Sequence, residues 1–210
     1  MGAGFEQLGE DDIHVGPVFS VSVGRVRTPK GETVEREYVR HPGAVMVVPV
    51  IDGDAVMVRQ YRAAIDRYLL EIPAGKRDVD GEDPRETAAR ELQEEVGLAA
   101  TELTLLSSFY NTPGFSDEYS HCYLATDCME VAADRQGSEE EHMTIERVAL
   151  ARVPELIATG ELDDAKSILG LLLARDQLGI AGGSPRRWRD ARCPTKPRSS
   201  CCGSASSGGG

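Results

Sequence analysis

A short acidic helix is the feature that most constrains the fold of this chain. The signals of a helix surround residues 84–96: Asp83 can act as the N-cap, and Pro84 suits the first helical position. Glu86 lies three residues after the cap and completes a capping box, while Gly97 fits a C-terminal stop. The residues expected on the buried face are Ala88, Ala89, Leu92 and Val96.

The other face of this helix carries Arg90, Glu91, Glu94 and Glu95. Glu91 and Glu95 are four residues apart, so their carboxylates stack on one side, and Arg90 can pair with Glu94 at the same spacing. Stacked like charges cost about 0.2–0.5 kcal/mol per pair, and a bound hard cation would turn that cost into a gain. Oxygen ligands suit Mg²⁺, with Mn²⁺ as a substitute. By spacing alone, however, a solvated charged face is the more frequent explanation.

The loop before the helix favours a metal site. Ala74 and Gly75 follow Pro73, so their backbone groups can face the helix carboxylates. A backbone oxygen, carboxylates and a substrate phosphate are a common ligand set for Mg²⁺. Phosphoryl transfer to water needs this charge neutralisation and a base that positions the water.

The rest of the chain predicts a mixed sheet with helices packed on it, in the α+β or α/β class. Alternating residues predict a hairpin at 17–28 and 33–40. Further strands are expected at 43–51, 55–61, 68–72, 102–110, 119–126 and 143–150. Helices are expected at 153–159 and 163–178, the second with an apolar stripe of Ile168, Leu169, Leu172 and Leu173 and a stop at Gly179.

The net charge of −12 is unevenly distributed. From Gly182 onward the composition is rich in Gly, Ser and Pro, with six Lys or Arg residues against one Asp. This basic, low-complexity tail (181–210) is expected to be disordered. The acidic remainder would repel a nucleic-acid backbone, and no run of 18 apolar residues exists, so neither nucleic acid nor a membrane is an expected partner. An acidic first segment without an apolar stretch predicts a cytoplasmic protein. Cys122 and Cys128 lack zinc-site spacing and are interpreted as ordinary buried or half-buried thiols.

Residues 75–98 resemble the Nudix box, a Gly and a Glu followed by R-E-U-x-E-E-x-G-U with U apolar. Here Gly75 and Glu82 precede Arg90-Glu91-Leu92-Gln93-Glu94-Glu95-Val96-Gly97-Leu98. One departure exists: six residues, not five, separate Gly75 from Glu82, an insertion in the loop that leaves the helix register intact. The resemblance implies an α+β Nudix fold, an α/β/α sandwich whose mixed sheet is flanked by helices, and Mg²⁺-dependent cleavage of a diphosphate.

The segments around the box resemble the ADP-ribose pyrophosphatase branch, over about residues 12–180. They are Gln60-Tyr61-Arg62, residues 71–75, residues 160–167 and Pro113, which lies 16 residues after Gly97. The resemblance implies hydrolysis of ADP-ribose to AMP and ribose 5-phosphate. Another nucleoside diphosphate sugar, such as ADP-glucose or GDP-mannose, is the alternative substrate. A non-catalytic nucleotide-sugar-binding regulator is the second class, disfavoured because the box carboxylates are present.

The branch also implies site residues, carried over position by position. The metal ligands would be the Ala74 carbonyl, Glu91, Glu95 and Glu140. The catalytic set would be Glu140, which positions the attacking water, with Glu95, Glu94 and Arg90. Glu139 is the second choice for the loop glutamate, and without the box this triplet of glutamates would be a solvated loop.

The substrate-binding residues implied by the branch are Arg36, Glu37, Arg62, Lys76, Thr112, Pro113, Gly114 and Glu118. Arg62 would bind the diphosphate and residues 112–114 the terminal ribose. Arg36 and Glu37, with Phe19 and Arg40, would touch the partner's adenine in a homodimer formed through the N-terminal strands. Without the branch, Arg62 could equally be a surface cation and Phe19 a core residue. The implied domains are a strand extension (1–42) for dimerisation, a Nudix hydrolase domain (43–180) and the tail (181–210).

Overall fold

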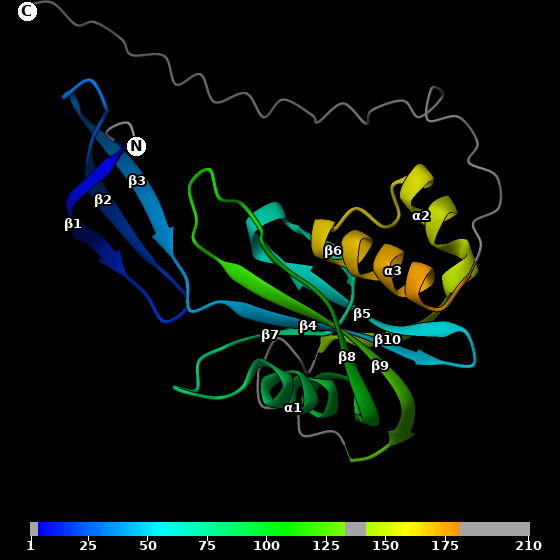
Figure 1. Cartoon of the computed structure of the whole chain (residues 1–210). Helices are drawn as coiled ribbons and strands as arrows, with labels where there is room; N and C mark the ends of the chain where they lie inside the picture. Colours follow the sequence, from blue (N-terminus) through cyan, green and yellow to red (C-terminus); the bar gives the residue numbers. More distant parts are fainter. Residues whose placement is uncertain (1–3, 133–141, 181–210) are drawn as a thin grey trace, which may run out of the picture.

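The computed structural model describes residues 4–132 and 142–180. Its body is a mixed sheet with helix α1 (Pro84–Val96) on one face and helices α2 (Val153–Thr159) and α3 (Ala165–Gln177) on the other. Figure 1 shows these three layers, which confirm the predicted α+β class and the α/β/α arrangement. A separate three-stranded sheet formed by the N-terminal residues projects from the body.

The main sheet has the strand order β10-β5-β4-β9-β8, with β6 added beside β5 and β7 beside β4. Strands β4 and β9 pair in parallel, and the other pairs are antiparallel. The strands are β4 (Ala44–Ile51), β5 (Asp54–Arg62), β6 (Arg67–Glu71), β7 (Ala74–Lys76), β8 (Leu98–Tyr110), β9 (Tyr119–Glu130) and β10 (Thr144–Ala149). The sequence predicted six of these strands but missed β7, which has only three residues and no apolar alternation.

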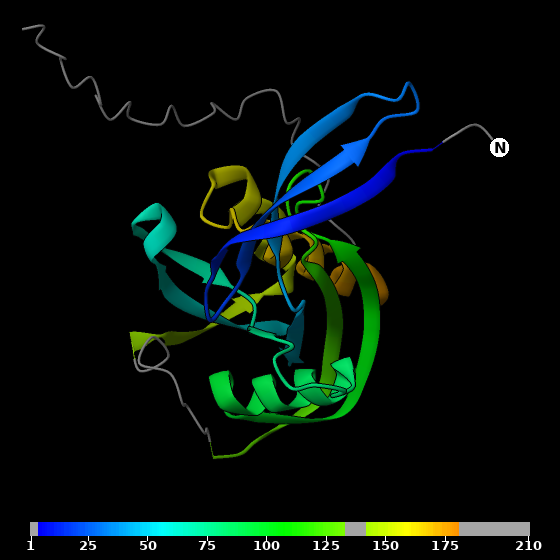
Figure 2. The same ribbon diagram turned by 90° about the vertical axis from the view of Figure 1, so that its left-hand side faces the viewer.

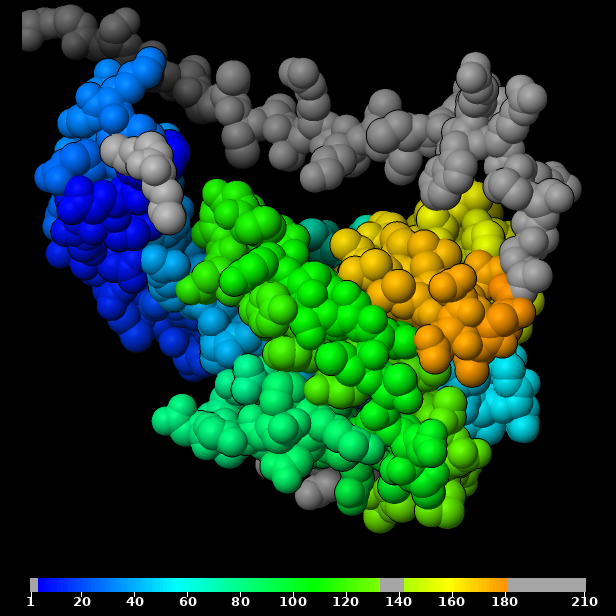
Figure 3. All heavy atoms as spheres, in the orientation of Figure 1, coloured from blue at the N-terminus to red at the C-terminus, as the bar shows by residue number. Residues whose placement is uncertain are grey.

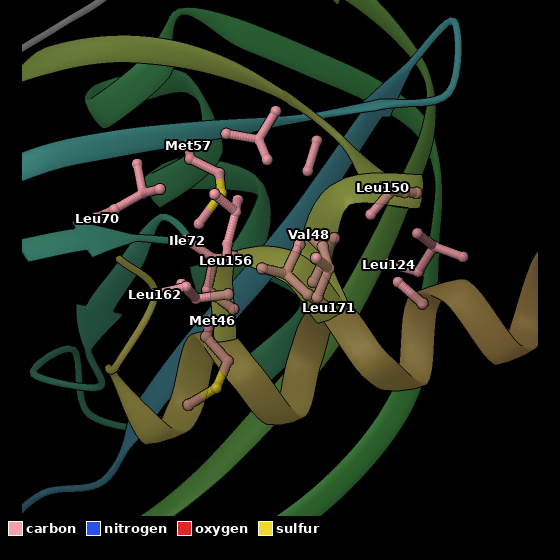
Figure 4. Packing of buried hydrophobic residues seen from close by; sticks show 14 of the residues in the cluster. Met46, Val48, Met57, Leu70, Ile72, Leu124, Leu150, Leu156, Leu162 and Leu171 are labelled. Carbon is pink, nitrogen blue, oxygen red and sulfur yellow. The ribbon is translucent and has the colours of Figure 1, made fainter. Parts of the chain in front are cut away.

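Two apolar clusters hold the layers together. The cluster between the sheet and helices α2 and α3 includes Met46, Val48, Ile72 and Leu171, and Figure 4 shows how its side chains meet. The cluster beneath α1 includes Val45, Val47, Ala88 and Leu92. Alternate residues of β4 therefore serve opposite faces, as expected for a strand buried on both sides.

The apolar stripe predicted on α3 is only partly buried. Ile168 packs against the core, but Leu169 and Leu172 are exposed. The buried residues of the helix are Ser167, Gly170, Leu171, Ala174 and Arg175. The run of apolar residues from 168 to 173 is compatible with two faces, and the face with small residues packs closest. A Cβ at Gly170 would lie 2.9 Å from Ile72 Cδ1, so glycine permits this contact. The helix ends at Gln177, and Gly179 adopts the expected left-handed conformation.

The start and end of α1 match the prediction, but its burial does not. The Asp83 carboxylate accepts from Arg85 N at 2.8 Å, and Gly97 has a φ of 63°. Ala89 is exposed, whereas Glu91 and Glu95 are buried. The helix therefore turns part of its charged face inward, toward the sheet and β7, instead of presenting it to solvent.

The N-terminal extension contains strands β1 (Glu6–Val15), β2 (Ser20–Arg27) and β3 (Thr33–Arg40) in that order. The predicted hairpin is β2–β3. Strand β1 was missed because its sequence is acidic and does not alternate, and its pairing with β2 has a register shift near Gly9. Figures 2 and 3 show this sheet projecting from the body. It leaves several large apolar side chains exposed: Phe5, Ile13, Val15, Val18 and Phe19.

Two predictions concern residues outside the described ranges: the glutamate loop with Glu139 and Glu140, and the tail 181–210. Cys122 is buried and Cys128 is partly buried, and both are free thiols, as expected. Among the described residues, no helix is long and apolar enough to span a membrane.

Candidate active site

Arg90 organises the acidic face of α1. Its Nη1 donates to Glu91 Oε1 at 2.9 Å and to Glu94 Oε2 at 3.0 Å, and its Nη2 donates to Glu82 Oε2 at 3.3 Å. Burial disfavours the charged form of Arg90, but the hydrogen bond to Glu82 and the charges of Glu91 and Glu94 raise its pKa. The guanidinium thus stays charged and fixes three carboxylates, including Glu82, which the loop insertion does not displace from the site.

Glu91 and Glu95 lie beneath the surface, with exposed fractions of 8% and 6%. Ala74 N donates to Glu95 Oε2 at 3.1 Å. The backbone groups of Pro73 and Arg77 form hydrogen bonds with β4 and the loop before it. Backbone groups alternate in direction along a strand, so those of Ala74, the residue after Pro73, point away from β4 and toward Glu95. Because the N–H and C=O of a strand residue point to the same side, the Ala74 carbonyl also lies on the side of the carboxylates.

Gly75 makes this arrangement sterically feasible. A Cβ at this position would lie 1.9 Å from Glu91 Cδ and 2.1 Å from Glu91 Oε1. The carboxylate therefore packs directly on the Gly75 backbone, where a larger residue has no room. This contact gives a physical reason for the glycine that opens the box.

The buried carboxylate of Glu91 is destabilised in its charged form. Burial raises its pKa to about 7, with Arg90 opposing the shift and Glu94 adding to it. Without a cation, Glu91 therefore holds a proton that the unfolded chain releases near pH 4.5.

We expect a metal-free protein whose stability falls as pH rises from about 4.5 to about 7. The protonated Glu91 contributes stability fully at lower pH, and ionisation removes it, by up to about 3 kcal/mol. Thermal denaturation in EDTA at several pH values would show this loss, and the Glu91→Gln variant should lack most of it. Equal pH dependence in both proteins would contradict the assignment.

The donor set around Ala74 fits a hard divalent cation. Within residues 4–132 and 142–180, no three His, Cys, Asp or Glu side chains form a metal site by themselves. The donors available to a cation are the buried carboxylates of Glu91 and Glu95 and the Ala74 carbonyl, and each of them offers an oxygen ligand. Such a partial shell suits Mg²⁺, which keeps waters and takes further ligands from substrate phosphates. Burial is the main cause of the raised pKa of Glu91, and a bound cation would offset the cost of keeping this buried carboxylate charged.

Arg62 lies at the end of β5, close enough to Glu95 for their charges to interact. Its Nε and Nη2 donate to the two carboxylate oxygens of Glu71, each at 2.7 Å. Lys166 also donates to Glu71. Burial raises the pKa of Glu71, but these two cations more than offset it and lower the pKa below its ordinary value. The structure therefore brings Arg62 to the site, paired instead of isolated on the surface.

The other predicted substrate residues do not all meet α1 within one chain. Thr112, Pro113 and Gly114 lie in the β8–β9 loop, which bonds to β3 and lies apart from α1 in Figures 1 and 2. Pro113 lines a hollow of about 210 Å³ with Tyr38, Tyr110 and Phe115. The hollow lies between the projecting sheet and the body, because residues of both line it.

The remaining predicted residues occupy three places. Glu118 is half-buried at the end of the β8–β9 loop, and Lys76 is half-buried at the end of β7. Arg36 and Glu37 are exposed on β3, as is Phe19 just before β2, so Phe19 is not a core residue. Arg40 pairs with Glu10 and Asp117. Strand β3, which carries Arg36 and Glu37, lies apart from α1 in Figures 1 and 2.

The sequence assigned no role to Glu71 or Lys166. The sequence did indicate that Glu71 needs a partner, because it follows two leucines in a predicted strand, where a charged residue must be paired. Which cation would supply that pairing depends on tertiary contacts between β5, β6 and α3, which the sequence pattern does not specify.

Known proteins resemble both the fold and the site. Residues 40–170 match the NUDIX domain family. The chain is 40% identical to an ADP-ribose pyrophosphatase of Bacillus subtilis, with 76% of this chain and 86% of that protein covered. It is 42% identical to an ADP-ribose pyrophosphatase of Mycobacterium tuberculosis, with 80% and 82% covered. A crystal structure of an ADP compounds hydrolase superposes with a TM-score of 0.72 at 27% identity, covering 85% of this chain and 96% of that one.

The sandwich fold, the acidic helix and this match together define a hydrolase class that acts on diphosphate bonds. The chain belongs to the Nudix family. Within that family, two of its bacterial relatives confirm the branch that the sequence indicated, the ADP-ribose pyrophosphatases.

Proposed function

We propose that this protein hydrolyses ADP-ribose to AMP and ribose 5-phosphate with Mg²⁺, which Mn²⁺ can replace. The observation that carries the proposal is the arrangement of Glu91, Glu95 and Arg62: two buried carboxylates, of which Glu95 is close enough to the Arg62 guanidinium for their charges to interact. A cation held by the carboxylates and a guanidinium fork would grip the same diphosphate from two sides. The names of the relatives support ADP-ribose over ADP-glucose or GDP-mannose.

Each site residue has a proposed role. Glu91, Glu95 and the Ala74 carbonyl would hold the cation, which when bound neutralises charge on the diphosphate. Arg90 orients Glu91 and Glu94 through the hydrogen bonds described above. Glu140 would position the attacking water; it lies outside the described residues, and this role is implied by the branch. Lys76, Glu118 and residues 112–114 would contact the substrate beyond the diphosphate.

Product analysis tests the proposed reaction. We expect ADP-ribose with Mg²⁺ to give AMP and ribose 5-phosphate, and EDTA to abolish turnover. In a panel with ADP-glucose and GDP-mannose, ranked by kcat/KM, ADP-ribose should come first. If ADP-glucose or GDP-mannose had the highest kcat/KM, that compound would be the preferred substrate instead of ADP-ribose. A lack of turnover on all three would refute the proposal that this protein is a nucleotide-sugar hydrolase.

We also propose that the chain acts as a homodimer through its N-terminal sheet. The exposed apolar residues of that sheet are the kind of surface that a partner covers, and Arg36 and Glu37 would then reach the partner's site. A cytoplasmic location remains a prediction from the sequence.

Sedimentation velocity tests the dimer. We expect the wild type to sediment as a dimer and the double variant Ile13→Glu/Val15→Glu as a monomer, since each change places a charge in the apolar contact. Leu172→Glu is the matched control, because Leu172 is an exposed apolar residue on α3. A monomeric wild type, or a double variant that remains dimeric, would contradict this interface.

A further inference from the structure

Glu71 is the most deeply buried acid near the site. Its exposed fraction is 0%, it lies at the end of β6, and it is paired across the sheet with Val58 of β5. A carboxylate removed from water is costly unless cations and hydrogen bonds compensate for it. Glu71 therefore depends on the two cations that it contacts, Arg62 and Lys166.

The contact with Arg62 fixes one edge of a guanidinium. Nε and Nη2 form two parallel hydrogen bonds of 2.7 Å with Glu71, and Nη1 takes no part in this pair. The Arg62 side chain nevertheless remains 39% exposed. A bidentate pair restricts both the position and the plane of the guanidinium, so Arg62 is oriented before any ligand arrives.

Lys166 links this pair to helix α3. Its Nζ contacts Glu71 and donates to Asp164 Oδ2 at 2.9 Å. Asp164 caps α3 by accepting from Ser167 N at 3.0 Å, and Ser167 Oγ accepts from Ile72 N at 2.9 Å. Ile72, the residue before the Pro73-Ala74-Gly75 segment, is thus bonded to the same helix terminus as Lys166.

The charges within this network balance. Arg62 and Lys166 carry two positive charges, and Glu71 and Asp164 carry two negative ones, with Lys166 in contact with both carboxylates. Without Lys166, the two carboxylates would leave a net negative charge beside Arg62. With Lys166 present, Glu71 can orient Arg62 while the negative charge that would repel an anion is offset.

We propose that Glu71 and Lys166 are positioning residues for diphosphate binding: Glu71 orients the Arg62 guanidinium, and Lys166 offsets the charge of Glu71. The inference rests on the proposed role of Arg62 as a diphosphate ligand. Neither residue touches the substrate; each acts through Arg62. A charged pair that served only to stabilise the fold would have no such effect on binding.

The test measures Kd for a methylene-bridged ADP-ribose analogue, which is not hydrolysed, by calorimetry with Mg²⁺. Arg62→Ala should weaken binding by about 30-fold and Glu71→Gln by about tenfold. Coulomb's law alone gives the opposite sign for Glu71→Gln, because removing a negative charge strengthens attraction for an anion. Lys166→Met should weaken binding by about fivefold. In an Arg62→Ala background, Glu71→Gln should have almost no further effect.

Asp163→Asn provides the control, because the exposed Arg67–Asp163 pair also joins β6 to the segment before α3. It should leave Kd unchanged, and melting temperatures would identify any variant that fails to fold. Unchanged or tighter binding in Glu71→Gln, an additive effect in the Arg62→Ala background, or equal weakening by Asp163→Asn would each overturn the positioning role. Unchanged binding in Arg62→Ala would refute the proposed role of Arg62 itself, whereas weakening by Arg62→Ala alone would refute only the inference.

Discussion

Glu95→Gln is expected to lower kcat by roughly three orders of magnitude while leaving the protein folded. The amide has nearly the shape of the carboxylate, and its oxygen can still accept from Ala74 N, as Glu95 does at 3.1 Å. It cannot supply the negative charge that a hard cation requires. The Mg²⁺ concentration for half-maximal activity should rise as well.

Steady-state kinetics with a Mg²⁺ titration would measure both effects. Glu86→Gln is the matched control, since it makes the same chemical change on the same helix at an exposed position in the first turn. It should retain activity. In EDTA, Glu95→Gln should melt near the wild-type temperature, because the amide oxygen can still accept from Ala74 N and no buried charge is left without a cation. Near-normal kcat would refute the assignment of Glu95 as a metal ligand.

The helix that carries Glu95 shows which features could be predicted from the sequence and which could not. Its start and end could be predicted because Asp83, Pro84 and Gly97 act through local backbone geometry. Its burial could not. The helical period of the apolar residues leaves Glu91 and Glu95 on the charged side, and their contacts with β7 lie between residues distant in the sequence. The metal-site interpretation therefore depended on the box resemblance instead of on the helix pattern.

The same limit explains the other differences. Helix α3 has apolar residues on two faces, and the packing of Gly170 on Ile72, Cys122 and Val48 selects one of them. Strand β1 pairs with β2 although its sequence is acidic, since cross-strand pairs such as Arg25 with Asp11 provide the compensation. In each case a tertiary contact chose between arrangements that the local sequence allows equally.

Gly75→Ala is the second change with a large expected effect. The new methyl group would lie 1.9 Å from Glu91 Cδ, within the volume of the carboxylate, and that carboxylate is buried and held by Arg90 at 2.9 Å. Either Glu91 moves out of the site or β7 moves off α1. Both outcomes separate the Ala74 carbonyl from the helix carboxylates, and we expect kcat to fall by about 100-fold or more.

Gly170→Ala separates this effect from loss of packing in general. Its methyl group would also be crowded, but at 2.9 Å and by the end of a flexible isoleucine on the opposite face of the sheet. We expect Gly170→Ala to lower the melting temperature while kcat stays within about twofold of wild type. Gly75→Ala should instead lose Mg²⁺-dependent stabilisation, measured as the rise in melting temperature when Mg²⁺ is added. If Gly75→Ala kept both that rise and wild-type kcat, the close packing of Glu91 on the loop would not be required for the site.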